Sequence, residues 1–237
     1  MRMCVAAVAA VAVVMTAQSV SAQTFAAPAS RPVLSTQSAS SRRSAPRPRP
    51  GLRVYGIFES EALSAHQSFE AVLGSSRFEL KGAGGDVVNV WRGAFARVTF
   101  TQGRKSGQRV FVTSSKTVIP LGIPVTVEMT PLEIGGGWRF ASLDHGGHVE
   151  PYVGAAGLWL HYKETSKFSD PGEDTDAKFT GSAVFGGIDV GIGFVRVGVE
   201  GLYRRVPKAL GDSGASQSFG EHDLGGGVIR LTIGIGF

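Results

Sequence analysis

Few residues of this sequence have the types and spacing that catalysis or metal binding requires. His161 stands close to Trp159 in an apolar-alternating segment, but no Ser or Asp beside it in the sequence completes a nucleophilic triad. Asp144, His145 and His148 are metal-binding types, yet they fall in a glycine-containing polar turn, which favours a solvated turn over a metal site. We therefore predict no catalytic residue, no metal site and no cofactor.

Two other patterns resemble ligand-binding motifs but lack the features that such motifs require. The acidic stretch SDPGEDTD, at residues 169–176, lacks the ordered ligand spacing of a calcium loop, so we expect an exposed, solvated loop. The glycine strings GAGG, GIGF and GGG lack the strand-to-helix context of a phosphate site. They are predicted to be positions of close backbone packing.

Charged residues recur instead at alternate positions of apolar segments. Val195, Val197 and Val199 alternate with Arg196 and Glu200, a period of two that gives a strand one apolar and one charged face. If the apolar faces meet lipid, the charged faces enclose an interior. The predicted interior set has six basic and five acidic members: Arg53, Glu59, Arg97, Glu128, Glu133, Arg139, Asp189, Arg196, Glu200, Arg204 and Arg230. Near equality of the two signs lets them pair, which predicts a closed interior without a stable open pore.

The elements that would position these charges are strand-like segments of about ten residues, the length of a tilted transmembrane strand. Eight of them occur, at residues 52–59, 84–91, 94–102, 123–140, 149–163, 179–192, 194–206 and 224–237. The connections between them alternate long and short, as in membrane barrels with long external loops and short periplasmic turns. We predict an all-β, antiparallel, up-and-down transmembrane barrel of eight strands, or of ten if residues 107–114 and 116–122 form separate strands.

Three local features refine this expectation. Tyr152 and Tyr162 lie ten residues apart in one segment and are predicted to occupy both aromatic girdles. The alternation around Pro131 slips by one, which predicts a bulge there. A short helix is expected in residues 64–74, with a capping box from Ser64 to Gln67 and Gly74 as its end.

The first 51 residues have a different composition from the rest. Residues 1–22 are predicted to be a signal peptide, with an apolar run after Arg2 and small residues before the cleavage point at Ala22. Cys4, the only cysteine, leaves with it. Residues 23–51, rich in Ser, Pro and Arg, are predicted to be a disordered periplasmic tether, and residues 52–237 the barrel. The barrel segment holds 18 basic and 19 acidic residues, so a nucleic-acid partner is not expected.

The alternating strands, the signal peptide and the ending at Phe237 together resemble the small eight-stranded bacterial outer-membrane β-barrels, such as the transmembrane domain of OmpA. The resemblance is architectural and covers residues 52–237. It implies residence in a Gram-negative outer membrane, in contact with its lipid. An even number of strands puts both termini on the side of the short turns, so the amino terminus is expected in the periplasm. The resemblance also implies that Leu231, Ile233, Ile235 and Phe237 form a signal read by the barrel assembly machinery.

For function, this resemblance favours a structural role, surface interaction with a ligand through the external loops, or passage of small solutes. Outer-membrane lipid-modifying hydrolases have a similar architecture and use Ser with His. An enzyme of that kind is the alternative.

Overall fold

The computed structural model describes residues 51–140, 142–143, 148–166, 174–211 and 214–236. The predicted signal peptide and nearly all of the predicted tether lie outside these residues. The described chain forms strands β1 (Gly51–Leu63), β2 (Arg77–Trp91), β3 (Ala94–Val112), β4 (Val118–Arg139), β5 (Val149–Ser166), β6 (Thr175–Ile192), β7 (Val195–Arg205) and β8 (Gly226–Gly236), with helices α1 (His66–Leu73) and α2 (Gly214–Phe219).

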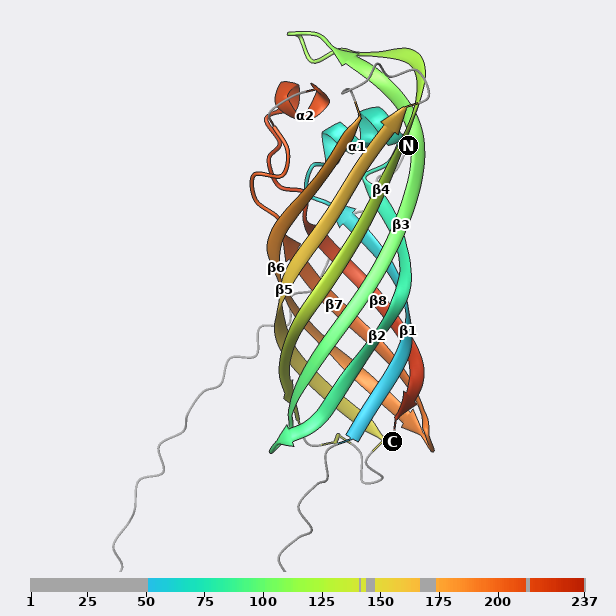
Figure 1. Ribbon diagram of the computed structural model, residues 1–237, viewed down its shortest axis with the longest axis vertical. Helices are drawn as coiled ribbons and strands as arrows, with labels where there is room; N and C mark the ends of the chain where they lie inside the picture. Colours follow the sequence, from blue (N-terminus) through green and yellow to red (C-terminus); the bar gives the residue numbers. More distant parts are fainter. Residues whose placement is uncertain (1–50, 141, 144–147, 167–173, 212–213, 237) are drawn as a thin grey trace, which may run out of the picture. The chain divides into compact units, whose positions relative to one another are not determined.

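These strands form one closed antiparallel barrel (Figure 1). Each strand pairs with the next along the chain, and β8 returns to β1, where Phe58 lies opposite Leu231. The predicted eight-stranded, up-and-down barrel is confirmed. Closure leaves no strand without a neighbour on either side, which a spanning sheet requires because lipid cannot hydrogen-bond to a free edge.

Alternate residues of each strand face opposite sides of the wall. On β7, Glu200, Leu202 and Arg204 are buried, whereas Val197, Val199 and Tyr203 are exposed. The outward apolar positions of this strand run from Val195 to Tyr203, a span of nine residues, which is the length that a tilted strand needs to cross a bilayer core. The surface of the barrel is therefore apolar where the interior is charged, the reverse of a water-soluble barrel.

The two ends of the barrel differ. At one, which we call the turn end, Arg92 and Gly93 join β2 to β3 with φ of 46° and 96°, as a two-residue hairpin turn requires. Gly193, with φ of 62°, closes the turn from β6 to β7 at the same end. The other end, the helical end, carries α1, α2 and the long β3–β4 hairpin (Figure 1).

Two expectations about the strands are wrong. Residues 107–114 and 116–122 form neither additional barrel strands nor a long loop. Most of them extend β3 and β4 into a hairpin that reaches beyond the adjacent strands. No bulge occurs at Pro131, because β4 pairs with β5 in one register from Val125 to Arg139. The inward-facing residues of β4 change from apolar to charged at the height of Pro131. In the sequence, this change resembles a one-residue shift of the apolar alternation.

The predicted short helix is present as α1. Its carboxyl end matches the expectation, since Gly74 has φ of 70° and its N–H bonds to Glu70 O at 3.0 Å. Its amino end does not, because the N-cap is Ala65 and no side chain of the predicted capping box bonds there. Instead, the Glu221 carboxylate accepts hydrogen bonds from the backbone N–H of Gln67 (3.0 Å) and Ser68 (2.9 Å). A residue distant in sequence thus caps the helix.

None of the helices in the described part of the chain is long and apolar enough to cross a membrane.

The interior at the helical end is filled by apolar side chains. Phe69 and Leu73 of α1 pack against residues of several strands in a cluster that we call the apolar plug. Burial of such side chains is the main favourable contribution to its stability, about 1.5–3 kcal/mol for each fully buried one. Its buried members are Leu63, Ala65, Phe69, Leu73, Phe78, Leu80, Val127, Met129, Leu158, Leu160, Tyr162, Val206 and Leu224.

Candidate functional site

The charged side chains of the interior form one connected set of ion pairs between the apolar plug and the turn end. Every strand contributes side chains from its alternate, inward-facing positions, so residues distant in sequence meet at the barrel axis. We call this set the ionic ladder. Its basic members are Arg53, Arg97, Arg139, Arg196, Arg204 and Arg230, and its acidic members are Glu59, Glu61, Asp86, Glu133, Glu150, Asp189 and Glu200.

The upper half of the ladder lies directly below the apolar plug. Arg204 donates to Glu133 Oε1 (2.8 Å), Glu61 Oε2 (2.7 Å) and Glu59 Oε2 (2.8 Å). Arg230 donates to Glu59 Oε1 (2.6 Å), to Glu133 Oε2 (2.6 Å) and to Glu200 Oε1 (2.7 Å). Each guanidinium uses its Nε and both Nη atoms, so both buried cations are surrounded by carboxylates as burial requires.

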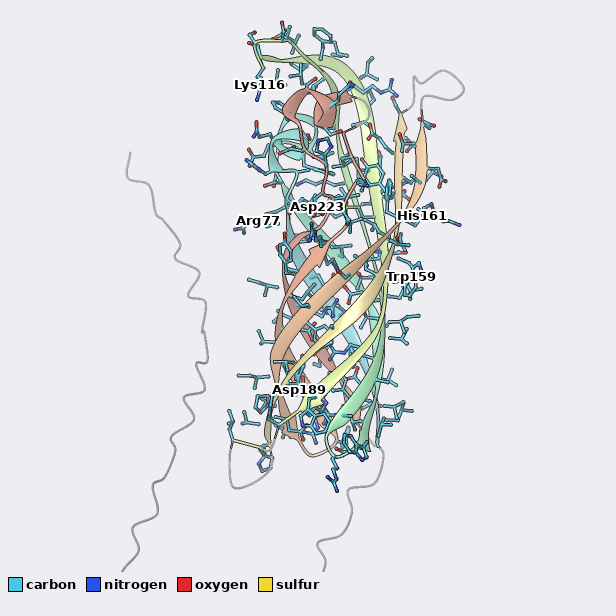
Figure 2. The ribbon with its side chains drawn as sticks, turned by 90° about the vertical axis from the view of Figure 1, so that its left-hand side faces the viewer. Arg77, Lys116, Trp159, His161, Asp189 and Asp223 are labelled. Atoms are coloured by element: carbon cyan, nitrogen blue, oxygen red, sulfur yellow. The ribbon has the colours of Figure 1, made fainter. Side chains whose placement is uncertain are left out.

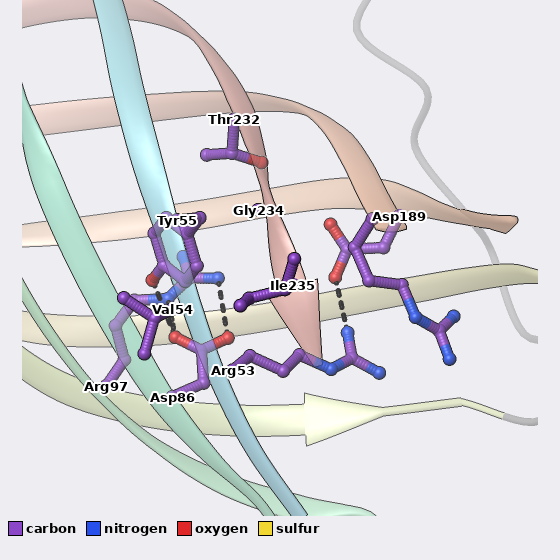
Figure 3. Close-up of a pocket in the computed structure, with 10 residues that line it drawn as sticks. Arg53, Val54, Tyr55, Asp86, Arg97, Asp189, Thr232, Gly234 and Ile235 are labelled. Carbon is purple, nitrogen blue, oxygen red and sulfur yellow. Dashed lines mark hydrogen bonds and ion pairs between the residues drawn. The ribbon is translucent and has the colours of Figure 1, made fainter. Parts of the chain in front are cut away.

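The lower half continues this set to the turn end. Arg97 bonds to Glu200 and, through Nε at 3.0 Å, to Asp86. Arg139 in turn connects Asp86, at 2.8 Å, with Asp189. Figure 3 shows the region in which Arg53 reaches Asp189 at 2.8 Å and Tyr55 donates to Asp86 at 2.6 Å.

At the turn end of the ladder, Arg53 and Arg196 both contact Glu150, at 2.5 and 3.3 Å. The pairs are therefore continuous from Glu61 to Arg196.

Aromatic rings fill the space beside the lower half. Phe95, Tyr152 and Phe185 pack together, with ring centroids 6.0–6.4 Å apart. The Arg97 guanidinium lies 4.8 Å from the Phe185 ring centroid, and that of Arg139 lies 4.9 Å from the Tyr152 centroid. Cation–π attraction of this kind is strongest where water is excluded. The rings thus stabilise the arginines on the sides that no carboxylate occupies.

A small cavity, of about 20 Å³, lies next to Arg53, Tyr55 and Asp86 in the lower half (Figure 3). This volume has room for about one water molecule. The ionic ladder and the apolar plug therefore occupy successive parts of the interior along the barrel axis.

The structure places ten of the eleven predicted interior charges inside the barrel: Arg53, Glu59, Arg97, Glu133, Arg139, Asp189, Arg196, Glu200, Arg204 and Arg230. The placement of Glu128 was wrong. Its side chain lies on the outer wall in an exposed ion pair with Arg104. Near the helical end the interior is apolar, so the inward residues there are Val127 and Met129 and the polar alternate residue faces out.

Glu61, Asp86 and Glu150 also belong to the ionic ladder, although they were not among the predicted interior charges. The same parity that placed Glu59 inside would have placed Glu61 there. Glu150 was missed because the facing of β5 was inverted, and Glu150 shares its face with Tyr152.

The girdle assignment of Tyr152 and Tyr162 is wrong. Both rings are buried, at 2% and 6% exposure, and face the interior. Trp159 and His161 alternate with the two tyrosines, so the girdle assignment put them inside the barrel; they lie instead on the outer wall (Figure 2). Both faces of this strand are apolar or small over much of its length, so the hydrophobic contrast that assigns facing elsewhere is absent here.

Other aromatic side chains occupy the outer wall. Trp91 and Trp138 form an edge-to-face pair near the turn end, with ring centroids 5.8 Å apart. Trp159 lies six residues beyond the β5 partner of Trp138, Val153, about 20 Å along the strand. Amphipathic rings at two heights of an apolar wall are typical of residues at the two membrane interfaces.

Several other predicted features lie partly or wholly outside the described residues. Phe237, Asp144 and His145 lie outside the described residues, as does most of the acidic loop. Leu231, Ile233 and Ile235 of the predicted assembly signal lie on the outer wall of β8. No cluster of three or more metal-ligating side chains occurs among the residues that the structure describes.

A closed barrel with an apolar outer wall and a paired, charged interior defines the class of protein: a small transmembrane β-barrel of eight strands. The architecture expected from the resemblance to OmpA-like barrels is confirmed.

Comparison with known proteins adds similar structures and no relatives in sequence. No protein-family model and no curated protein matches the chain. The chain is similar to the crystal structure of Ail, the attachment invasion locus protein of Yersinia pestis, with 12% identity, a TM-score of 0.48 and coverage of 80% of this chain and 100% of that one.

Two further crystal structures are similar. They are the N-terminal β-barrel domain of Pseudomonas aeruginosa OprF (8% identity, 80% and 100% coverage, TM-score 0.46) and Neisserial surface protein A (11%, 79% and 94%, 0.43). Identities this low carry no information about ligand or partner, so the interpretation of the site rests on the geometry of this chain.

Proposed function

We propose that this protein is an integral outer-membrane β-barrel of a Gram-negative envelope whose interior is closed to solutes and whose role is exercised at its helical end. The observation that supports this proposal is that the apolar plug and the ionic ladder both occupy the interior of the barrel. A solute would have to displace both the apolar plug and the ionic ladder, whose cations, except Arg196, each pair with two or more carboxylates. A structural or surface-interaction role is thus better supported than solute passage.

The helical end is the part of the protein that offers a surface for interaction. It carries α1, α2 and the β3–β4 hairpin, whereas the β2–β3 and β6–β7 connections at the turn end consist of two residues each. In outer-membrane barrels the short turns are periplasmic and the long connections external. We infer that the helical end faces the outside of the cell.

Single-channel conductance in planar bilayers tests the closed interior. We expect no steady, porin-like steps from the unmutated protein. We expect none from Glu200→Ala either, because the apolar plug above the ladder remains in place. Large, steady steps from the unmutated protein would contradict the proposal and favour general diffusion.

Surface labelling of intact cells tests the membrane and the orientation. Lys116 lies at the tip of the β3–β4 hairpin (Figure 2), and Arg92 lies in a turn at the opposite end. A membrane-impermeant maleimide should label Lys116→Cys on intact cells, and Arg92→Cys only after the outer membrane is permeabilised. The opposite pattern would invert the orientation, and recovery of the protein in the soluble periplasmic fraction would refute membrane residence.

The hydrolase alternative requires a nucleophile beside His161. His161 Nε2 lies 2.7 Å from Asp176 Oδ1 on the outer wall, and within the described ranges no Ser or Thr hydroxyl is hydrogen-bonded to the ring. A surface ion pair explains this arrangement, so we propose a non-enzymatic role. Hydrolysis of outer-membrane phospholipid by the purified protein, abolished by His161→Ala, would instead establish the alternative.

A further inference from the structure

A pocket of about 530 Å³ opens at the helical end, above the apolar plug. Its walls come from α1, from the β3–β4 hairpin, from β5 and β6, and from α2 with the segment before it. These elements gather at one end of the barrel in Figure 1. The volume lies within the range of small-molecule sites, and the mouth of a barrel is a common place for them.

The walls of the pocket are apolar and polar in about equal measure. The apolar members include Phe69, Val72, Val110, Leu121, Val127 and Leu210. Phe69 and Val127 also belong to the apolar plug, so the floor of the pocket is the top of that plug. The pocket is therefore blind, because the plug and the ionic ladder below it close the way to the turn end. Such a site suits retention of a small molecule and not its passage.

Polar groups mark two different heights of the wall. Among the described residues that line the pocket, Arg109 is the basic side chain and Glu164 the acidic one. Glu164 lies opposite Val127 on β4, whereas Gln108, the neighbour of Arg109, lies opposite Pro124. Three residues of a strand span about 10 Å. Arg109 thus stands nearer the tip of the hairpin, at the rim, and Glu164 stands deeper, where it accepts a hydrogen bond from the Tyr162 hydroxyl at 3.0 Å.

We propose that this pocket binds a small amphipathic molecule with an apolar body and an anionic head group. The body lies against the apolar walls and the head group lies at Arg109. An apolar body gains free energy by leaving water, and a guanidinium at the rim fixes the orientation of a carboxylate or similar anion. This proposal makes the proposed surface-interaction role more specific. It rests on that proposed function only in assuming the side of the membrane from which the ligand enters.

Equilibrium binding of radiolabelled dodecanoate to the full protein in lipid nanodiscs tests the proposal, with empty nanodiscs as the measure of partition into lipid. We expect saturable binding of one molecule per barrel. Ala215→Trp and Val110→Trp place a bulky ring into the pocket from two different walls and should each weaken binding by at least about tenfold, because they occupy the ligand's volume. Arg109→Gln should weaken it about fivefold through loss of the charged contact.

The controls separate the pocket from its surroundings. Gln217→Trp adds the same ring to the exposed face of α2, and Arg205→Gln removes a cation from the outer wall of β7, so both should bind as the unmutated protein does. Heat-modifiable migration on a gel establishes that each variant is folded. Uptake no greater than that of empty nanodiscs would overturn the site. So would an affinity of both tryptophan variants equal to that of the unmutated protein. Equal affinity for dodecyltrimethylammonium would overturn the anionic head group.

Because nanodiscs expose both ends of the barrel, failure of this experiment would leave the membrane residence and orientation proposed above intact, and the labelling experiment decides those separately.

Discussion

Two adjacent arginines of β7 show how strand parity decides what a charged residue does. Arg204 faces inward, is 2% exposed and donates to three carboxylates, whereas Arg205 faces outward and is exposed. The chemistry of the two side chains is identical. Their contributions differ because only one is held in a water-poor interior, where an uncompensated partner is costly.

We predict that Arg204→Met destabilises the folded barrel by about 3–5 kcal/mol, because it leaves the carboxylates of Glu59, Glu61 and Glu133 short of a cation. Arg205→Met should change the free energy of unfolding by less than about 0.5 kcal/mol. Reversible urea unfolding in lipid vesicles, followed by tryptophan fluorescence, measures both. Similar losses for the two variants would contradict the ionic ladder as a stabilising feature.

At the scale of elements, α1 and α2 depend on each other. Glu221, which follows α2, accepts the backbone N–H groups of Gln67 and Ser68 and the Ser68 hydroxyl at 2.6 Å. These N–H groups would otherwise lack partners, and a carboxylate at a helix amino end also interacts favourably with the helix dipole. One carboxylate thus connects the β1–β2 connection to the β7–β8 connection.

We predict that Glu221→Ala destabilises the first turn of α1 by about 1 kcal/mol, the usual cost of a lost cap. Amide hydrogen exchange at Gln67 and Ser68 should accelerate about fivefold, while exchange in the barrel strands stays unchanged. Glu70→Ala is the matched control, because Glu70 is exposed on the same helix and makes only a 3.4 Å contact with Ser76 through its carboxylate. Unchanged exchange in Glu221→Ala would refute the cap.

The facing of a strand could be predicted from the sequence where its two faces differ clearly in polarity. Toward the turn end, charged inward positions such as Arg196 and Glu200 alternate with valines, and the facing was predicted correctly. Toward the helical end both faces are apolar or small, so β5 was inverted and Pro131 was mistaken for a bulge. The extension of β3 and β4 into a long hairpin was missed, although the β-branched residues Val110, Val112, Val118 and Ile119 are a signal for it.

The site was only partly predictable for the same reason. Parity identifies which charges share an interior, but it cannot say which of them meet across the barrel axis. That pairing depends on the register of all eight strands, and Asp86, which connects Arg97 with Arg139, was not identified at all. The pocket at the helical end requires the helices and the hairpin in place, which no local pattern encodes.

For the whole molecule, the apolar outer wall implies that stability depends on lipid and on depth. Val199 lies at the middle of the outward apolar positions of β7 and pairs across to Leu231, which also faces outward. Thr165 lies near the helical end of β5, six residues beyond Trp159.

We predict that Val199→Arg costs about 2–4 kcal/mol in lipid vesicles and Thr165→Arg less than about 1 kcal/mol, since the cost of an arginine falls from the midplane to the interface. Urea unfolding of the two variants in the same vesicles measures the difference. Equal costs would mean that the membrane midplane does not lie at Val199.

The pairs between Arg230 and Glu59 join residues 171 positions apart, on the last and the first strand of the barrel. While the chain is an open sheet, Arg230 and Glu59 have not yet met, and an edge with unpaired charges cannot enter hydrocarbon without a cost of several kcal/mol. Insertion strand by strand is therefore unfavourable. The chain must curl and join its two ends before or during its entry into the bilayer, so that a barrel missing β8 would stall at the membrane surface and would not insert as a smaller sheet.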